Sequence, residues 1–198
     1  AGARPLLQAS EVEVGLSLRS FLKRSVDIAL LRVSRPTVHL IIHADGTTNI
    51  PGGGGGLSAT ETLINLAVGH FEMKDGIAIL NEQKIPFDID ADGIQANLVF
   101  DPGQKLYQGN IEISRLLKGQ QVIRLESAFS FGTNRADIRG LHLTSGKSSL
   151  EGSGWFQNWS AMQGELNLKV QANVPEVAQW MDISSIHTGA VTGDIQGK

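Results

Sequence analysis

Residues 26–46, VDIALLRVSRPTVHLIIHADG, form two apolar runs rich in β-branched residues, which meet at Pro36 and stop at the pair Asp45-Gly46. Such alternation predicts β-strands that bury one face and leave the other face in water. Pro36 suits a corner between two strands, because it has no backbone N–H to donate. Almost the whole chain repeats this pattern and offers little helix, so something else must cover the apolar face.

Composition sets bounds on the function. The formal charge of −3 and a pI near 5.9 give no basic surface for a nucleic acid, and Lys and Arg are scattered rather than clustered. The chain has no Cys, which excludes disulfides and thiolate zinc sites. No stretch approaches the roughly 20 apolar residues that span a bilayer. Because the chain opens on Ala1 and ends at Gly197-Lys198 within a strand-like pattern, we expect a segment of a longer protein whose membrane anchor lies elsewhere.

The predicted organisation is one continuous β architecture in three parts. Residues 1–51 form a first β unit, 52–57 a glycine-rich linker loop, and 58–198 the continuing sheet. Short helices are expected near 60–66, where a capping-box pattern begins, and near 175–181.

Two Asp-Gly pairs are predicted to be hairpin turns. Asp75-Gly76 and Asp92-Gly93 each lie between two alternating apolar runs, which is the strongest short-range signal for a β-hairpin. The motif Ala-Asp-Gly also recurs, at 44–46 and at 91–93, with an offset of 47 residues. Repeats of this length favour an extended, stacked sheet over a closed globule.

The acidic stretch DIDADG at 88–93 matches the first half of a calcium-binding loop, with three alternating carboxylates before a Gly. The bidentate Glu expected at the twelfth position is Val99, and the flanking residues are typical of strands rather than helices. We therefore interpret Asp88, Asp90 and Asp92 as a solvated strand face, and predict no metal.

No catalytic residue is predicted either. Gly146-Lys147-Ser148 resembles the end of a phosphate-binding loop, but the preceding Gly is wrongly spaced and no helix pattern follows, so a turn between strands is the better interpretation. His39 and His43 lie roughly 13 Å apart along one strand and cannot share a metal without a third partner. No Ser lies in a Gly-x-Ser-x-Gly nucleophile elbow. The chain is therefore not expected to be an enzyme, and no cofactor is implied.

Apolar side chains at alternate positions of most predicted strands form the candidate site. Two architectures fit them: a sandwich whose two sheets cover each other, and an elongated, curved antiparallel sheet that forms an open apolar trough. In the trough, the exposed apolar surface would mark a ligand or partner site. The residues predicted to line it are Val38, Leu40, Ile42, Ile77, Ile79, Phe87, Ile89, Leu98, Phe100, Ile123, Leu125, Phe129, Leu141, Leu143, Leu166 and Leu168.

The pattern resembles the AsmA-like superfamily, and most closely its TamB-type and AsmA-type periplasmic members. The resemblance rests first on the unit at 26–50, with its Arg35-Pro36 corner and its ending ADGTTNI, and on the glycine-rich linker. Further stretches that resemble the family are GHFEMKDG at 69–76, ADIRGLHLTSG at 136–146, LEGSG at 150–154 and VPEVAQW at 174–180. Together they cover most of the chain.

This resemblance implies the open trough, with short helical interruptions, in a periplasmic protein anchored in the inner membrane. It implies that the groove carries phospholipid acyl chains toward the outer membrane, and that an outer-membrane assembly protein is a partner. The family offers no catalytic residues to transfer to this chain.

The leading hypothesis is a segment of a lipid-transport protein that acts without chemistry. The alternative is a periplasmic assembly factor that binds strands of outer-membrane proteins through its sheet edges. A carbohydrate-binding or hydrolytic β-solenoid is disfavoured, because no clustered pair of acids lies among exposed aromatic residues.

Overall fold

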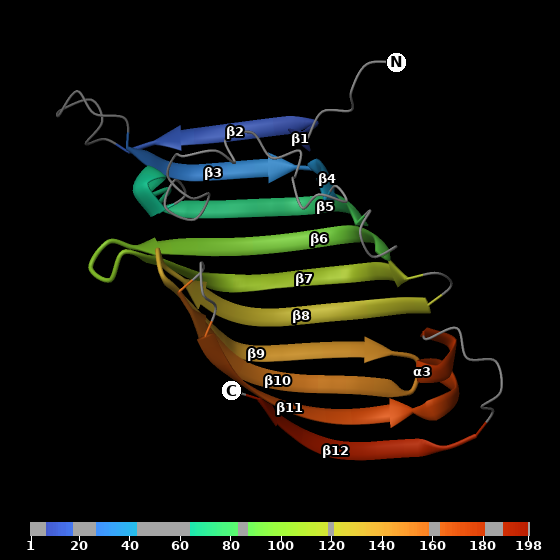
Figure 1. Cartoon of the computed structure of the whole chain (residues 1–198). Coiled ribbons are helices and arrows are strands. Elements are labelled where there is room, and N and C mark those ends of the chain that lie inside the picture. Colours follow the sequence, from blue (N-terminus) through green and yellow to red (C-terminus); the bar gives the residue numbers. More distant parts are fainter. Residues whose placement is uncertain are drawn as a thin grey trace.

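The computed structural model describes residues 7–17, 27–42, 64–82, 87–118, 121–158, 163–180 and 188–197. These residues form one open, curved and mainly antiparallel sheet of twelve strands (Figure 1). The strands are β1 (Leu7–Gln8), β2 (Glu11–Leu16), β3 (Ile28–Ser34), β4 (Thr37–Ile42), β5 (His70–Glu82), β6 (Phe87–Asp101), β7 (Leu106–Lys118), β8 (Gln121–Phe131), β9 (Arg135–Ser145), β10 (Ser148–Gln157), β11 (Gln163–Asn173) and β12 (Ala190–Gly197).

The predicted mainly β fold with an open, curved sheet is confirmed. The sandwich is wrong for the described residues, because all of their strands belong to the same sheet. The helix expected near 175–181 is α3 (Val174–Trp180), and a helical turn at 64–66 occupies the end of the other predicted helix. The predicted linker at 52–57 lies outside the described residues.

Strands β5 to β12 form a meander in which each strand pairs with the next one in the sequence. At the other end of the sheet, β3 and β4 both run parallel to β5, one after the other along the same edge. The corner at Arg35-Pro36 therefore interrupts the strand without reversing it, opposite Asp75-Gly76 of β5. It is held by two backbone hydrogen bonds, from Arg35 N–H to Lys74 O (2.8 Å) and from Ile77 N–H to Pro36 O (2.7 Å).

The two predicted Asp-Gly hairpin turns are wrong. Strand β5 runs through Asp75-Gly76 and β6 runs through Asp92-Gly93, and the register between the two strands shifts at both places. Asp75 has a φ of 53° and Gly93 a φ of 66°, so both pairs provide the left-handed conformation that the turn signal announced. A β-bulge can use the same left-handed conformation as a hairpin turn. Here the two pairs form β-bulges inside two long strands.

A small core lies at one end of the strands. Ile64, Val68 and Tyr107 are buried there. The Tyr107 ring stacks on Phe131, with 5.5 Å between the ring centroids, and is tilted against Phe100 at 5.0 Å. The helical turn at 64–66 thus covers this end of the sheet through aromatic packing.

Candidate functional site

The two faces of the sheet carry different chemistry. A cross-strand row of directly paired residues on β6 to β11 is entirely aliphatic; its members are Ile94, Ile113, Leu125, Leu143, Leu150 and Val170. The residues next to them in sequence pair in the same way and are entirely polar: Gln95, Glu112, Glu126, His142, Glu151 and Lys169, followed by Asp194 on β12. Because successive side chains of a strand point to opposite faces, we call the first the apolar face and the second the polar face.

The apolar face is mostly uncovered by the described residues. In its aliphatic row only Ile94 is buried, at 8% exposure, and the other five side chains are half-buried. Cover comes from the helical turn at 64–66 at one end of the strands and from α3 at the opposite end (Figure 1). Between them, the apolar face of β8 runs from Leu125 through Ser127 to Phe129, which is about 13 Å at about 3.3 Å per residue.

Ten of the sixteen predicted groove residues lie together on the apolar face by register. They are Val38, Leu98, Phe100, Ile123, Leu125, Phe129, Leu141, Leu143, Leu166 and Leu168. The side chains of Leu40, Ile42, Phe87 and Ile89 fall outside the described part of the chain.

The placement of Ile77 and Ile79 on this face is wrong. Ile77 pairs with Asp92 and Ile79 with Asp90, whereas the intervening Ala78 pairs with the buried Ala91. Both isoleucines therefore belong to the polar face, and Ile77 is 39% exposed. The cause is the pair of bulges, since each extra residue moves the following side chains to the opposite face.

Sequence reasoning also missed residues that the structure adds to the apolar face. Ile94, Ile113 and Leu150 belong to the aliphatic row. Their alternation with polar neighbours could have revealed them. Tyr107 could not be found in this way, because its role depends on contacts with a segment 39 residues away.

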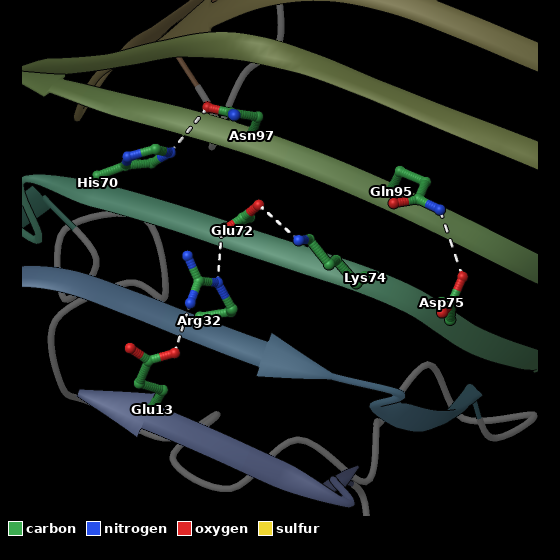
Figure 2. Close-up of polar contacts among 8 residues, drawn as sticks. All are labelled: Glu13, Arg32, His70, Glu72, Lys74, Asp75, Gln95 and Asn97. Atoms are coloured by element: carbon green, nitrogen blue, oxygen red, sulfur yellow. Dashed lines mark hydrogen bonds and ion pairs between the residues drawn. The ribbon is translucent and has the colours of Figure 1, made fainter. Parts of the chain in front are cut away.

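The polar face is held together by ion pairs at its N-terminal strands (Figure 2). Arg32 on β3 donates through Nε to Glu72 on β5 at 2.6 Å, and through Nη1 to Glu13 on β2 at 2.5 Å. Lys74 adds a contact to Glu72 at 3.2 Å. The hydrogen bond from Arg32 lowers the pKa of Glu72, with Lys74 acting in the same direction, and the same bond to Glu72 raises the pKa of Arg32. This network ties the edge strand β2 to the sheet.

The acidic stretch on β6 belongs to the polar face. Asp92 pairs with Arg115 on β7 at 3.0 Å, and Asp90 is exposed. The side chain of Asp88 falls outside the described residues. Among the residues that the structure describes, no three His, Asp or Glu side chains are grouped as metal ligands.

Two other sequence features are also placed. Gly146-Lys147 forms the predicted turn, between β9 and β10. Trp155 lies on the polar face, paired with Glu165 and Asp137, and the guanidinium of Arg135 sits 4.9 Å from its ring centroid.

Helix α3 is fastened to the end of the apolar face by Glu176. Its carboxylate accepts hydrogen bonds from the Lys147 backbone N–H at 2.9 Å and from Ser148 Oγ at 2.5 Å, and Asn173 caps the helix by accepting from the Glu176 N–H. Burial acts to raise the pKa of Glu176, but the bonds from Ser148 and Lys147 outweigh it and hold the pKa below its usual value. Asn173 is therefore the N-cap residue of α3, but the Asn173 N–H donates to Ser148 Oγ rather than to Glu176, so the two residues do not form a reciprocal capping box.

No protein-family model, curated protein or solved structure matches this chain significantly. Within its described residues, the chain has no helix that is both long and apolar enough to span a membrane.

Proposed function

We propose that this chain is a segment of a bacterial lipid-transport protein, in which the apolar face carries phospholipid acyl chains between the inner and outer membranes. One observation supports this most directly. The apolar face extends over six adjacent strands, β6 to β11, and the described residues cover it only at the strand ends, where α3 lies beside Leu143, Leu150 and Val170. Apolar surface that a protein leaves uncovered over such an extent normally marks a partner or ligand site.

The chemistry of the face suits transfer. Ile, Leu and Val side chains attract an acyl chain only through the apolar surface that the contact buries, which stabilises it by about 25 cal/mol per Å². No charged group of the aliphatic row interrupts the path. An apolar floor without charged groups binds lipid without a deep local minimum, so an acyl chain can slide from strand to strand. The charged headgroup would remain in water. No bond is made or broken, so the proposed role is not enzymatic.

The resemblance to AsmA-like proteins supports the setting of this proposal. Under this proposal the protein lies in the periplasm, and a segment outside this chain anchors it in the inner membrane. The resemblance also suggests an outer-membrane assembly protein as a further partner.

Photo-crosslinking tests the proposal on both faces of the same strands. A photoreactive residue at Leu125 or Leu141, on the apolar face, should capture phospholipid in cells. The matched controls are Glu126 and His142, their sequence neighbours on the polar face, which should capture little or none. Equal capture on both faces, or capture of protein alone, would contradict lipid transport.

The alternative function as an assembly factor is favoured by the edges of the sheet. In the described residues β2 pairs only with β3 and β12 only with β11, and every residue of β12 is exposed. A strand from an outer-membrane client could extend either edge. A proline scan over β12 should then damage function more than Leu125→Asp does, whereas lipid transport predicts the opposite order.

A further inference from the structure

A pocket lies where α3 meets the apolar face, over the ends of β8 to β11. Its volume is about 180 Å³, and its apolar lining is formed by Ile123, Leu143, Leu150, Val170, Ala172 and Val177. Leu143, Leu150 and Val170 belong to the aliphatic row, so the pocket continues the apolar face beneath the helix. Aliphatic cavities of roughly 150 Å³ stay dry and admit apolar molecules the size of benzene. This pocket can therefore take several methylene groups of an aliphatic chain.

One buried polar atom of the pocket has no hydrogen-bond partner among the described residues. Ser145, the last residue of β9, lines the pocket, is 3% exposed, and its Oγ makes no hydrogen bond within the described residues. Buried hydroxyls are normally hydrogen-bonded, and each exception needs an explanation. The neighbouring Ser148 differs, because its hydroxyl donates to Glu176 and accepts from the Asn173 N–H at 3.0 Å. A ligand oxygen would give the Ser145 hydroxyl the hydrogen-bond partner that the described residues do not provide.

The charges around the pocket restrict that ligand oxygen. The lining contains no Lys or Arg, and the carboxylate of Glu176 lies close by, bonded to Ser148 of the lining. An anionic group would enter without a counter-ion and beside a like charge, which is unfavourable in an apolar site. The ligand oxygen that hydrogen-bonds to the Ser145 hydroxyl is therefore uncharged, as in an ester carbonyl or an alcohol.

We propose that this pocket binds part of an aliphatic chain bearing an uncharged oxygen, which hydrogen-bonds to Ser145 Oγ. The inference deepens the proposed function and rests on it, since an acyl ester on the apolar face is such a chain. Under it, α3 and Ser145 form a specific holding site at the rim of an otherwise uniform surface. Free fatty-acid anions are selected against.

Titration of the full chain with 1-octanol and with octanoate, followed by NMR of the methyl groups of Val170 and Val177, tests this site. Octanol should shift these signals in a saturable way, and octanoate at neutral pH should bind at least about tenfold more weakly. Ser145→Ala should weaken octanol binding by about tenfold, which corresponds to one ordinary hydrogen bond. The control Ser127→Ala alters a serine of the same face that is outside the pocket lining and should leave binding unchanged.

Three results would overturn the pocket site: no saturable shift with octanol, an unchanged octanol affinity in Ser145→Ala, or equal binding of octanoate. The second of these would mean that a bound water satisfies Ser145. Val177→Phe, which fills the pocket, should abolish octanol binding, and the retained signals of distant methyl groups would show that the sheet is intact. If lipid capture at Leu125 and Leu141 persists while the octanol result is negative, only the pocket site fails and the proposed function stands.

Discussion

The backbone N–H of Val68 donates a hydrogen bond to the hydroxyl of Tyr107, 2.7 Å away. Both residues are only 3% exposed, so no water is available to replace this bond. It joins the segment that precedes β5 to the start of β7, and the Tyr107 ring packs between Phe100 and Phe131 at the same place. One side chain therefore provides both the aromatic packing and the polar partner that hold the helical turn at 64–66 on the sheet.

Tyr107→Phe keeps the ring and removes only the hydroxyl. The Val68 N–H would then be buried without a partner, so we expect a loss of about 1–3 kcal/mol in the free energy of unfolding. Urea denaturation measures the loss, and hydrogen exchange should show faster exchange of the Val68 amide. Phe100→Leu is the comparison, because it reduces ring packing but keeps the hydrogen bond. The Val68 amide should exchange more slowly in Phe100→Leu than in Tyr107→Phe. Equal exchange rates in both variants would contradict the role of the hydroxyl.

Gly146→Ala should destabilise the attachment of α3. Gly146 has a φ of 55°, and an added Cβ would lie 2.4 Å from Glu176 Oε1. The left-handed conformation alone costs a residue with a Cβ about 1–2 kcal/mol, and the displaced carboxylate loses its hydrogen bonds as well. Gly140→Ala, in the preceding strand β9, has no atom within 4 Å of the new Cβ and no positive φ, so the stability of this variant should be nearly unchanged. Thermal unfolding of the two variants measures the difference, and similar losses would count against this account.

The contribution of Glu176 should depend on pH in a defined direction. Its pKa is below the ordinary value of 4.5, so the native carboxyl binds a proton more weakly than the unfolded one. Its stabilisation is therefore fully present above about pH 4.5 and is lost as the pH falls through the lower native pKa. Glu176→Gln removes the titration, so the stability difference between wild type and variant should shrink from pH 7 to pH 3. A difference that stays constant over this range would contradict the assignment.

Much of this fold could be predicted from the sequence, because alternation reports directly which side chains share a face. The strands follow from that alternation, which fits a sandwich and an open sheet equally well; the open sheet is the expectation that the resemblance to AsmA-like proteins adds. The failures lie where the period of two is interrupted. Asp75-Gly76 and Asp92-Gly93 provide a left-handed residue that serves a hairpin or a bulge equally well, and only the pairing of β5 with β6 decides between them.

The candidate site shows the same limit. Leu125 and Leu143 could be placed because their strands alternate through a continuous register at that point. Ser145 could not, because its significance depends on α3 folding back over the end of β9, which no local pattern announces. The environment of a buried polar atom is set by segments that are distant in sequence.

The reversal of faces at the bulges can be tested with one substitution on each face of the sheet. Ile77→Lys places a charge on the polar face, at a position already 39% exposed, and should change stability by no more than about 0.5 kcal/mol. Ile94→Lys places the same charge at a position that is 8% exposed on the apolar face. It should cost at least about 2 kcal/mol, since truncating a buried isoleucine to Ala alone costs about 2–5 kcal/mol. Chemical denaturation of both variants measures the two losses. If β5 alternated without a bulge, Ile77 would lie on the same face as Met73 and the Ile77→Lys variant would lose stability as Ile94→Lys does.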